Sequence, residues 1–291
     1  MSRVNEAFLQ LRDALNGRQL PYLDPEYYAE AHLLFELCSN QRSLIANWLC
    51  EWTADHFRDL SSMAILSVGC GKGIVDFQVA THLIAGKSPL MYVGVEPNVD
   101  DANVCQHLLN SIDGVEGSVL VGKWPDCASK LHDKKFDVIL FIHCLYHVVD
   151  VSEALDEALC LLKPQGQGPC TGLNELCTTL GPPQHDGTLP FWWADTIKST
   201  VAEREYNIVH ESILNGQIDL SLCRDENSRK GKAILDFTVF ACIPDDLRDH
   251  VLNVLAALAN EQQITESSER LIINHPVHVW VLQKSHLPAQ H

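Results

Sequence analysis

The feature that most constrains this chain is a glycine-dense loop in the stretch ILSVGCGKGIVDFQV, which begins at residue 65. A short apolar run comes first, and Gly69, Gly71 and Gly73 follow at intervals of two, ahead of an apolar pattern of helical period. Glycines at this density break a strand or a helix unless the backbone must approach another group closely. The stretch therefore predicts a strand, a loop and a helix, with the loop placed to touch a ligand at the carboxyl end of a sheet.

The rest of the chain after residue 61 alternates short apolar runs with helical patterns. Such alternation predicts an α/β fold with a mostly parallel sheet and helices on both faces. The run at 136–144 is nearly all apolar, as expected of a strand buried on both sides. Strands are expected at 64–68, 91–96, 117–123, 136–144, 206–213, 218–223 and 277–283, and helices at 73–84, 99–111, 151–162 and 245–261.

Residues 1–60 have a different pattern and are expected to be helical. Asp24 and Pro25 fit the cap and the first position of a helix, and acidic residues follow in its first turn. The first 17 residues predict an amphipathic helix rather than a signal peptide.

The pattern fails after Pro164, where a parallel sheet of this kind needs a fifth apolar strand. The sequence there is QGQGPCTGLN, at 165–174, and glycine and proline at this density are incompatible with a central strand. We therefore expect the fifth strand to be missing or replaced, and 164–190 to be an irregular loop.

Charge and cysteine usage exclude several classes of partner. The net charge of −17 disfavours nucleic acid, because phosphate binding needs basic patches, and suits encounter with cationic small molecules. No apolar run approaches the length of about 18 residues that a membrane span requires. The eleven cysteines form no CxxC pair, which indicates free thiols in a reducing cytosol. His143 and His147 lie four apart at a strand end without a third ligand, so no metal site is expected.

The spacing of the glycines decides between two kinds of nucleotide-like ligand. Dinucleotide-binding loops require G-x-G-x-x-G, but the third glycine position holds Ile74. The observed G-x-G-x-G is typical of S-adenosylmethionine (SAM)-dependent methyltransferases. Glu96 ends the next strand about 20 residues further on, where an acid accepts both ribose hydroxyls. The alternative is a simple turn followed by a solvated acid.

With these motifs the chain resembles the histamine N-methyltransferase-like family of SAM-dependent small-molecule methyltransferases. The resemblance rests on ILSVGCGKGIVDFQV, VEPN and FDVILFIHCLYHVVD, and on IDLSLC, ILDFTVFACIPDDLR and INHPVHVWVLQK in the family's order. It implies a Rossmann-like class I methyltransferase sheet whose last strand is antiparallel. It also implies a helical segment at 1–60 that caps the substrate, and a SAM-dependent methyltransferase domain at 61–291.

The resemblance further implies the site residues. The cofactor S-adenosyl-L-methionine is expected to contact Gly69, Cys70, Gly71, Gly73, Glu96, Pro97, Asp101 and Ile142. The substrate is expected near Tyr28, Gln41, His143, Tyr146, Phe237 and His275, with His143 accepting or relaying a proton. Purely structural roles stay open as alternatives: Tyr28 as a core aromatic, His143 as a structural histidine and His275 as a loop histidine.

Departures from the family pattern limit the function. The family's amine pocket has Glu where this chain has Gln41, Gln in place of His143 and Asn in place of His275. Because Gln41 supplies no charge for a cationic amine, we predict methylation of another small amine or heteroaromatic nitrogen, and not of histamine itself. The alternatives are O- or S-methylation of a small metabolite, and a non-catalytic or defective methyltransferase-like protein that acts as a binding module. We expect a cytoplasmic monomer.

Overall fold

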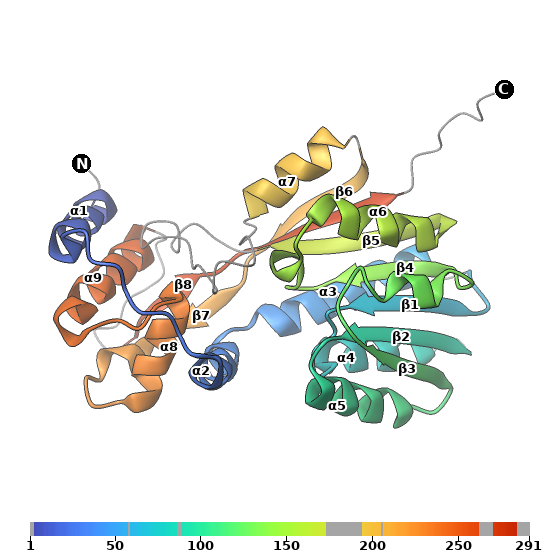
Figure 1. Cartoon of the computed structure of the whole chain (residues 1–291), viewed down its shortest axis with the longest axis horizontal. Coiled ribbons are helices and arrows are strands. Elements are labelled where there is room, and N and C mark those ends of the chain that lie inside the picture. The colour runs from blue at the N-terminus through green and yellow to red at the C-terminus, as the bar shows by residue number, and fades with distance from the viewer. Residues whose placement is uncertain are drawn as a thin grey trace. The chain divides into compact units, whose positions relative to one another are not determined.

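The computed structural model describes residues 3–57, 59–85, 89–172, 194–204, 206–261 and 270–283 (Figure 1). The chain divides into two compact units, which are considered one at a time. The sheet unit takes in Ser43–Leu173, Leu189–Leu214 and Val277–His291, and the helical unit takes in Met1–Arg42 and Asn215–Pro276. The two units are defined by their compactness, and residues 215–276 are grouped with the N-terminal helices. They do not test the expected domain boundary at residue 60, which stays a prediction.

The sheet unit is built on one seven-stranded sheet in the order β3-β2-β1-β4-β5-β9-β6. The first five of these strands run parallel, and β9 runs antiparallel to both β5 and β6. This arrangement confirms the predicted α/β class with an antiparallel last strand. The strands are β1 (Met63–Val68), β2 (Leu90–Glu96), β3 (Val115–Val121), β4 (Phe136–Phe141), β5 (Leu162–Gly172), β6 (Asn207–Leu214) and β9 (Val277–Gln283).

The prediction that the fifth strand is missing was wrong. β5 covers Leu162–Gly172, pairs with β4 on one edge and is closed by β9 on the other. Between the pairs Phe136↔Leu162 and Val138↔Gln167 the register shifts, so Pro164 falls in a bulge, where a missing N–H is tolerated. Lys163 also pairs with Asp137 of β4 at 2.7 Å. Pairing on both edges thus makes a strand from a segment of poor strand propensity. Residues 164–172 of the expected loop therefore belong to β5, and the rest of that loop, 173–190, lies outside the described residues.

Helices cover both faces of this sheet, as the strand–helix alternation predicts. Helices α3 (Gln41–His56), α4 (Ile74–Ile84) and α5 (Val99–Asn110) pack on one face, and α6 (Val151–Leu161) and α7 (Ala194–Glu203) on the other. Successive residues of β1 point to opposite faces, so Ile65 packs in the first layer and Leu66 in the second. The buried strands are therefore apolar on both sides.

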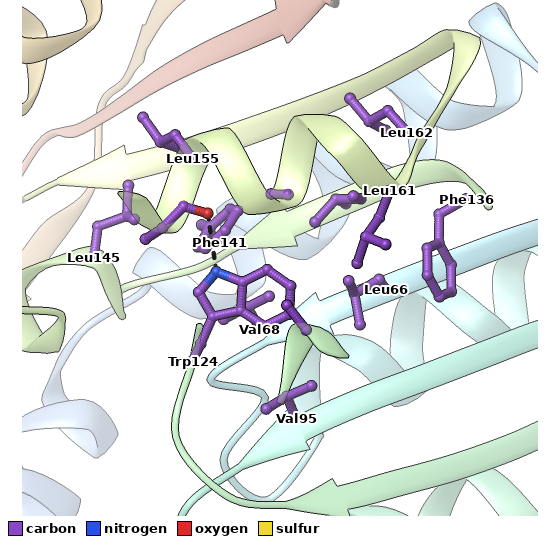
Figure 2. Packing of buried hydrophobic residues seen from close by; sticks show 14 of the residues in the cluster. Leu66, Val68, Val95, Trp124, Phe136, Phe141, Leu145, Leu155, Leu161 and Leu162 are labelled. Atoms are coloured by element: carbon purple, nitrogen blue, oxygen red, sulfur yellow. Dashed lines mark hydrogen bonds between the residues drawn. The ribbon is translucent and has the colours of Figure 1, made fainter. Parts of the chain in front are cut away.

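A tryptophan fixes the loop after β3 to the second of these layers (Figure 2). Trp124 packs among Val68, Phe141 and Leu145, and its indole N–H donates to the Ala154 carbonyl at 2.9 Å. Because that donor is satisfied, the large ring can be buried without leaving an unpaired polar group.

The helical unit consists of α1 (Arg3–Leu15), α2 (Pro25–Cys38), α8 (Arg229–Val239) and α9 (Asp245–Glu261), with a small pair of antiparallel strands, β7 (Gln217–Asp219) and β8 (Ile272–Asn274). The predicted start of α2 is confirmed: the Asp24 side chain accepts the Tyr27 N–H at 2.9 Å and Pro25 is the first helical residue.

One expected strand ends early in this unit, and a charged stretch that follows it is helical. The strand expected at 218–223 ends at Asp219, because its carboxylate accepts the backbone N–H of Ser221 and turns the chain into a short 3-10 helix. The charged stretch at 225–232 becomes helical from Arg229, since the Ser228 hydroxyl caps the Gly231 N–H at 3.0 Å.

Within the described ranges, no helix is both long enough and apolar enough to cross a bilayer. Those ranges also contain no group of three or more histidine, cysteine, aspartate or glutamate side chains arranged to hold a metal ion.

Candidate active site

The glycine loop joins β1 to α4 at the carboxyl end of the sheet. Gly69, Gly71 and Gly73 have φ angles of 65°, 55° and 72°, a region that side chains with a Cβ rarely adopt. The backbone N–H groups of Gly69 and Cys70 donate to the Val95 carbonyl at 2.8 and 3.2 Å. The loop is thereby tied to the end of β2, the strand that carries the predicted ribose acid.

Steric contacts separate the roles of the three glycines. A Cβ on Gly69 would lie 2.5 Å from the Cys144 Cβ, and one on Gly73 would lie 2.5 Å from the Cys105 Sγ. Those two glycines therefore permit close packing inside the protein. A Cβ on Gly71 would meet nothing within 4 Å. Close packing therefore does not explain this glycine, and the space above the loop is open at this point.

Glu96 ends β2 and lies beside the glycine loop. Its two carboxylate oxygens accept the N–H groups of Gly71 and Asn98, each at 2.9 Å. Burial raises the pKa of the Glu96 carboxyl above its ordinary value, and the two backbone hydrogen bonds partly oppose that rise. Each oxygen keeps a further lone pair, so the carboxylate can accept hydroxyl donors in addition to the backbone.

The remaining cofactor residues lie around this loop. Pro97 follows Glu96, and Asn98 caps α5 by accepting the N–H groups of Asp100 and Asp101 at 2.9 and 3.1 Å. The Asp101 carboxylate lies 4.0 Å from the Lys72 ammonium of the loop, which places it beside the glycines. Ile142 follows β4 and packs on the same apolar layer as Cys70.

The predicted catalytic residue also lies next to the loop. His143 has a φ of 50°, unusual for a side chain with a Cβ, and precedes Cys144, whose Cβ defines the close approach to Gly69. The Cys144 thiol donates to the Val68 carbonyl at 3.0 Å, which holds this turn against the end of β1. Tyr146 is in the short 3-10 helix Leu145–His147, and its side chain is outside the described part of the structure.

The other four predicted substrate residues all belong to the helical unit, and the structure brings them together. The rings of Tyr28 and Phe237 are 5.3 Å apart, and the Gln41 amide N–H donates to the His275 carbonyl at 2.8 Å. Phe35 joins the two pairs, since its ring lies 4.9 Å from Phe237 and 5.5 Å from His275. We call these five residues the aromatic cluster.

His275 is the least expected member of this cluster. Its side chain is 7% exposed, and burial lowers its pKa to about 4, so the ring is neutral at physiological pH. Its Nδ1 atom is buried without a hydrogen-bond partner, which is uncommon for a polar atom in a protein interior. A bound polar group would satisfy that atom.

Sequence reasoning missed His32 and Phe35, which complete the surroundings of Phe237. His32 stacks on Phe237 at 5.1 Å and pairs with Glu36 at 3.2 Å. Glu36 also pairs with Arg42, so this carboxylate already has a cationic partner. The spacing of Tyr28, His32 and Phe35 on one face of a helix was the available signal.

A seven-stranded sheet of this order, a glycine loop and a strand-end acid together define a class I methyltransferase domain. The comparisons agree: a family model described as a methyltransferase domain matches residues 39–211, more than half of the chain. The chain therefore belongs to this methyltransferase-domain family.

Curated relatives match this chain over only part of their length. Ubiquinone biosynthesis O-methyltransferase of Rickettsia bellii (strain OSU 85-389) is 27% identical over 130 residues, which are 44% of this chain and 49% of the relative. The enzyme of the same name from Rickettsia felis is 26% identical over 128 residues, 44% of this chain and 48% of the relative. The matches thus span about half the length of these proteins.

Solved structures with low sequence identity share the fold. The YcgJ protein from Bacillus subtilis has a TM-score of 0.51 at 12% identity, covering 82% of this chain and 99% of the other. The plantazolicin methyltransferase BpumL in complex with SAH has a TM-score of 0.50 at 12% identity, covering 97% and 98%.

These findings identify S-adenosyl-L-methionine as the methyl donor. The residues present fit this cofactor, because Gly71 leaves open space above the loop and the buried Glu96 carboxylate stands beside it. Glu96 would hold the ribose, and the bound cofactor supplies an electrophilic methyl group.

Proposed function

We propose that this chain transfers a methyl group from SAM to a nitrogen of a small amine or heteroaromatic metabolite. The proposal that SAM binds here rests on one observation: the Glu96 carboxylate accepts a hydrogen bond from the Gly71 N–H at the open part of the loop. The proposed class of methyl acceptor rests on the aromatic cluster and on the family resemblance to histamine N-methyltransferase-like enzymes.

The chemistry of the aromatic cluster favours an uncharged planar acceptor. The rings of Tyr28, Phe35 and Phe237 contact one another, and we propose that a flat acceptor packs against this group of rings. His275 is neutral, and its orphaned Nδ1 can make one hydrogen bond to a polar group of the acceptor. Gln41 brings no charge, and its amide is already bonded to the His275 carbonyl. Histamine, a cation at neutral pH, is accordingly not the proposed acceptor.

The chain's own residues have two tasks in this reaction. Methyl transfer is a direct displacement, so alignment of the acceptor nitrogen with the methyl group provides much of the rate. The nitrogen must be unprotonated, and we propose that His143 accepts or relays its proton and that Tyr146 helps to bind the acceptor. A cytoplasmic location and a monomeric state complete the proposal, on the grounds of free thiols and acidic charge.

One alternative has a specific observation in its favour. The matched Rickettsia relatives are named as O-methyltransferases, which supports oxygen as the accepting atom. The same cofactor site would serve oxygen or sulfur acceptors. The non-catalytic alternative has lost its main support, because it relied on a missing fifth strand and β5 is present.

The experiment has two stages. Calorimetric titration of the purified chain with SAM measures cofactor binding directly. Methyl uptake from labelled SAM is then measured on three matched acceptor panels: heteroaromatic and aromatic amines, the corresponding phenols and the corresponding thiols. Preferred transfer to the nitrogen panel supports the proposal, and preferred transfer to phenols or thiols replaces it. SAM binding without transfer to any panel would favour the binding-module alternative.

A further inference from the structure

Phe240 has a backbone conformation that its side chain disfavours. Its φ of 54° and ψ of 32° place it in the left-handed region, directly after α8. Among the described residues that are not glycine, only Asn16 and His143 share a positive φ, and asparagine and histidine adopt this region more readily than a bulky aromatic residue does. Glycine is the usual residue at such a helix end, so the phenylalanine here needs an explanation.

The backbone around Phe240 is held by hydrogen bonds that do not involve its ring. The Phe240 N–H donates to the Phe237 carbonyl at 3.1 Å. The Ala241 N–H donates to the Asp236 carbonyl, also at 3.1 Å, which completes a Schellman cap. Beyond the cap, the Asp236 carboxylate accepts the Ile243 N–H at 2.9 Å. The chain on either side therefore imposes the left-handed conformation, and a strained residue persists only where its surroundings impose it in this way.

The ring of Phe240 packs against the aromatic cluster. Its centroid lies 5.0 Å from that of Phe237, and the two ring planes are tilted by 47°. The rings of Tyr28, His32 and Phe35, which also contact Phe237, come from α2. Phe240 contacts Phe237 from the end of α8, the helix that carries both rings, and is itself only partly buried. The Phe237 ring is thus fixed by neighbours from two helices, and one of these neighbours is held at the cost of backbone strain.

We propose that Phe240 is a positioning residue of the acceptor site: its ring holds the Phe237 ring in the orientation against which a planar acceptor packs. The inference rests on the proposed function, which assigns the acceptor to the aromatic cluster. It explains why an aromatic residue occupies a position where glycine would relieve the strain. Because Phe240 acts through Phe237 and not on the reacting atoms, loss of its ring should weaken acceptor binding and leave the displacement step unchanged.

Two substitutions separate the role of the ring from the strain. Phe240→Ala removes the ring and keeps a Cβ in the left-handed region, whereas Phe240→Gly removes both. Phe240→Gly should therefore melt at a higher temperature than Phe240→Ala, although both lack the ring. Phe240→Tyr keeps the ring and should behave as the unaltered chain. Phe8→Ala is the matched control, because Phe8 is a partly buried phenylalanine of α1 outside the aromatic cluster.

The test uses 3-aminoquinoline, a planar amine that is uncharged at neutral pH, as the acceptor. Methyl uptake from labelled SAM gives kcat and KM, calorimetry gives the Kd of the amine and of SAM, and thermal unfolding gives stability. In both Phe240→Ala and Phe240→Gly, we expect the KM and Kd for the amine to rise about three- to tenfold, the range for one aromatic pair. The kcat and the Kd of SAM should stay unchanged. Phe240→Tyr should keep the original KM, and Phe8→Ala should keep it despite a lower melting temperature.

An unchanged KM and Kd in the folded variants that lack the ring would overturn this inference and leave the proposed function intact. A KM that follows the melting temperature across all variants would also overturn it, because Phe240 would then act only on the stability of the fold. If the unaltered chain prefers the phenol panel, 3-hydroxyquinoline replaces the amine and the same variants decide. If it binds no member of any panel, the proposed acceptor site fails and this inference fails with it. If Phe240→Ala does not fold, the unstrained Phe240→Gly decides.

Discussion

At the scale of single residues, Glu96 has two roles in one carboxylate. It accepts N–H groups from the glycine loop and from the start of α5, and it is the acid that we assign to the ribose. Glu96→Ala removes both, so we expect SAM affinity to fall by about 1.5–3 kcal/mol, the range for hydrogen bonds to a charged group. Calorimetric titration measures this change.

The matched control for that variant is Glu116→Ala, which removes an exposed carboxylate from β3. It should bind SAM as the unaltered chain does. Equal affinity of a folded Glu96→Ala variant and the control would remove the ribose assignment.

His275 predicts a pH dependence of stability. Its folded-state pKa of about 4 lies below the ordinary value of 6.5, so the unfolded state binds the proton more readily. This stabilising effect is fully present above pH 6.5 and is lost as the pH falls from there toward 4. Between pH 7 and pH 5 the loss is about 2 kcal/mol. Denaturant unfolding at both pH values measures it.

The variant His275→Gln should flatten this part of the stability profile, whereas His82→Gln, at an exposed position of α4, should leave it unchanged. An unaltered slope in His275→Gln would show that the acid sensitivity arises elsewhere.

Substitution of Gln41 distinguishes the effect of charge in the aromatic cluster from the effect of its hydrogen bonding. In Gln41→Glu the donor to the His275 carbonyl becomes an acceptor, so we expect a loss of about 1–3 kcal/mol of stability. The new carboxylate should nevertheless raise turnover of cationic amines relative to neutral ones. Unfolding and methyl uptake are measured beside Gln78→Glu, an exposed control. Efficient turnover of histamine by the unaltered chain would contradict this view of the pocket.

At the scale of elements, the sequence predicts local features better than distant pairings. The glycine loop, its strand and its acid were recognisable because a few neighbouring residues determine them. β5 was not, because its strand conformation depends on β4 and β9, the latter more than 100 residues away in sequence. The contact of Phe35 with His275 likewise joins segments distant in sequence, so spacing alone could not reveal it.

The presence of β5 determines how the stability of the chain should respond to an insertion. A sheet lacking a central strand would gain from an added apolar segment, but β5 already pairs on both edges. Insertion of eight apolar residues after Pro164 should therefore lower the melting temperature, because it lengthens the bulge without adding pairs. An eight-residue Gly/Ser insertion at the same place is the control. If the apolar insertion melted above both the control and the unaltered chain, the sheet would need a further strand.

At the scale of the whole molecule, one acidic chain contains two compact units with different predicted roles. The sheet unit contains the cofactor loop and Glu96, and the helical unit contains the aromatic cluster. Each unit has apolar layers of its own, so each can respond separately to a ligand. This division makes the location of SAM binding measurable by unfolding.

SAM should stabilise the chain by mass action, because it binds the folded loop and not the unfolded chain. At 100 times the dissociation constant this contributes about 2.7 kcal/mol, which for a protein of this size raises the melting temperature by about 5 °C or more. Differential scanning calorimetry with and without SAM measures the shift. If two transitions are resolved, only that of the sheet unit should move. Glu96→Ala should lose most of the shift at the same SAM concentration and Glu116→Ala should keep it, whereas an equal shift in all three chains would place SAM away from the glycine loop.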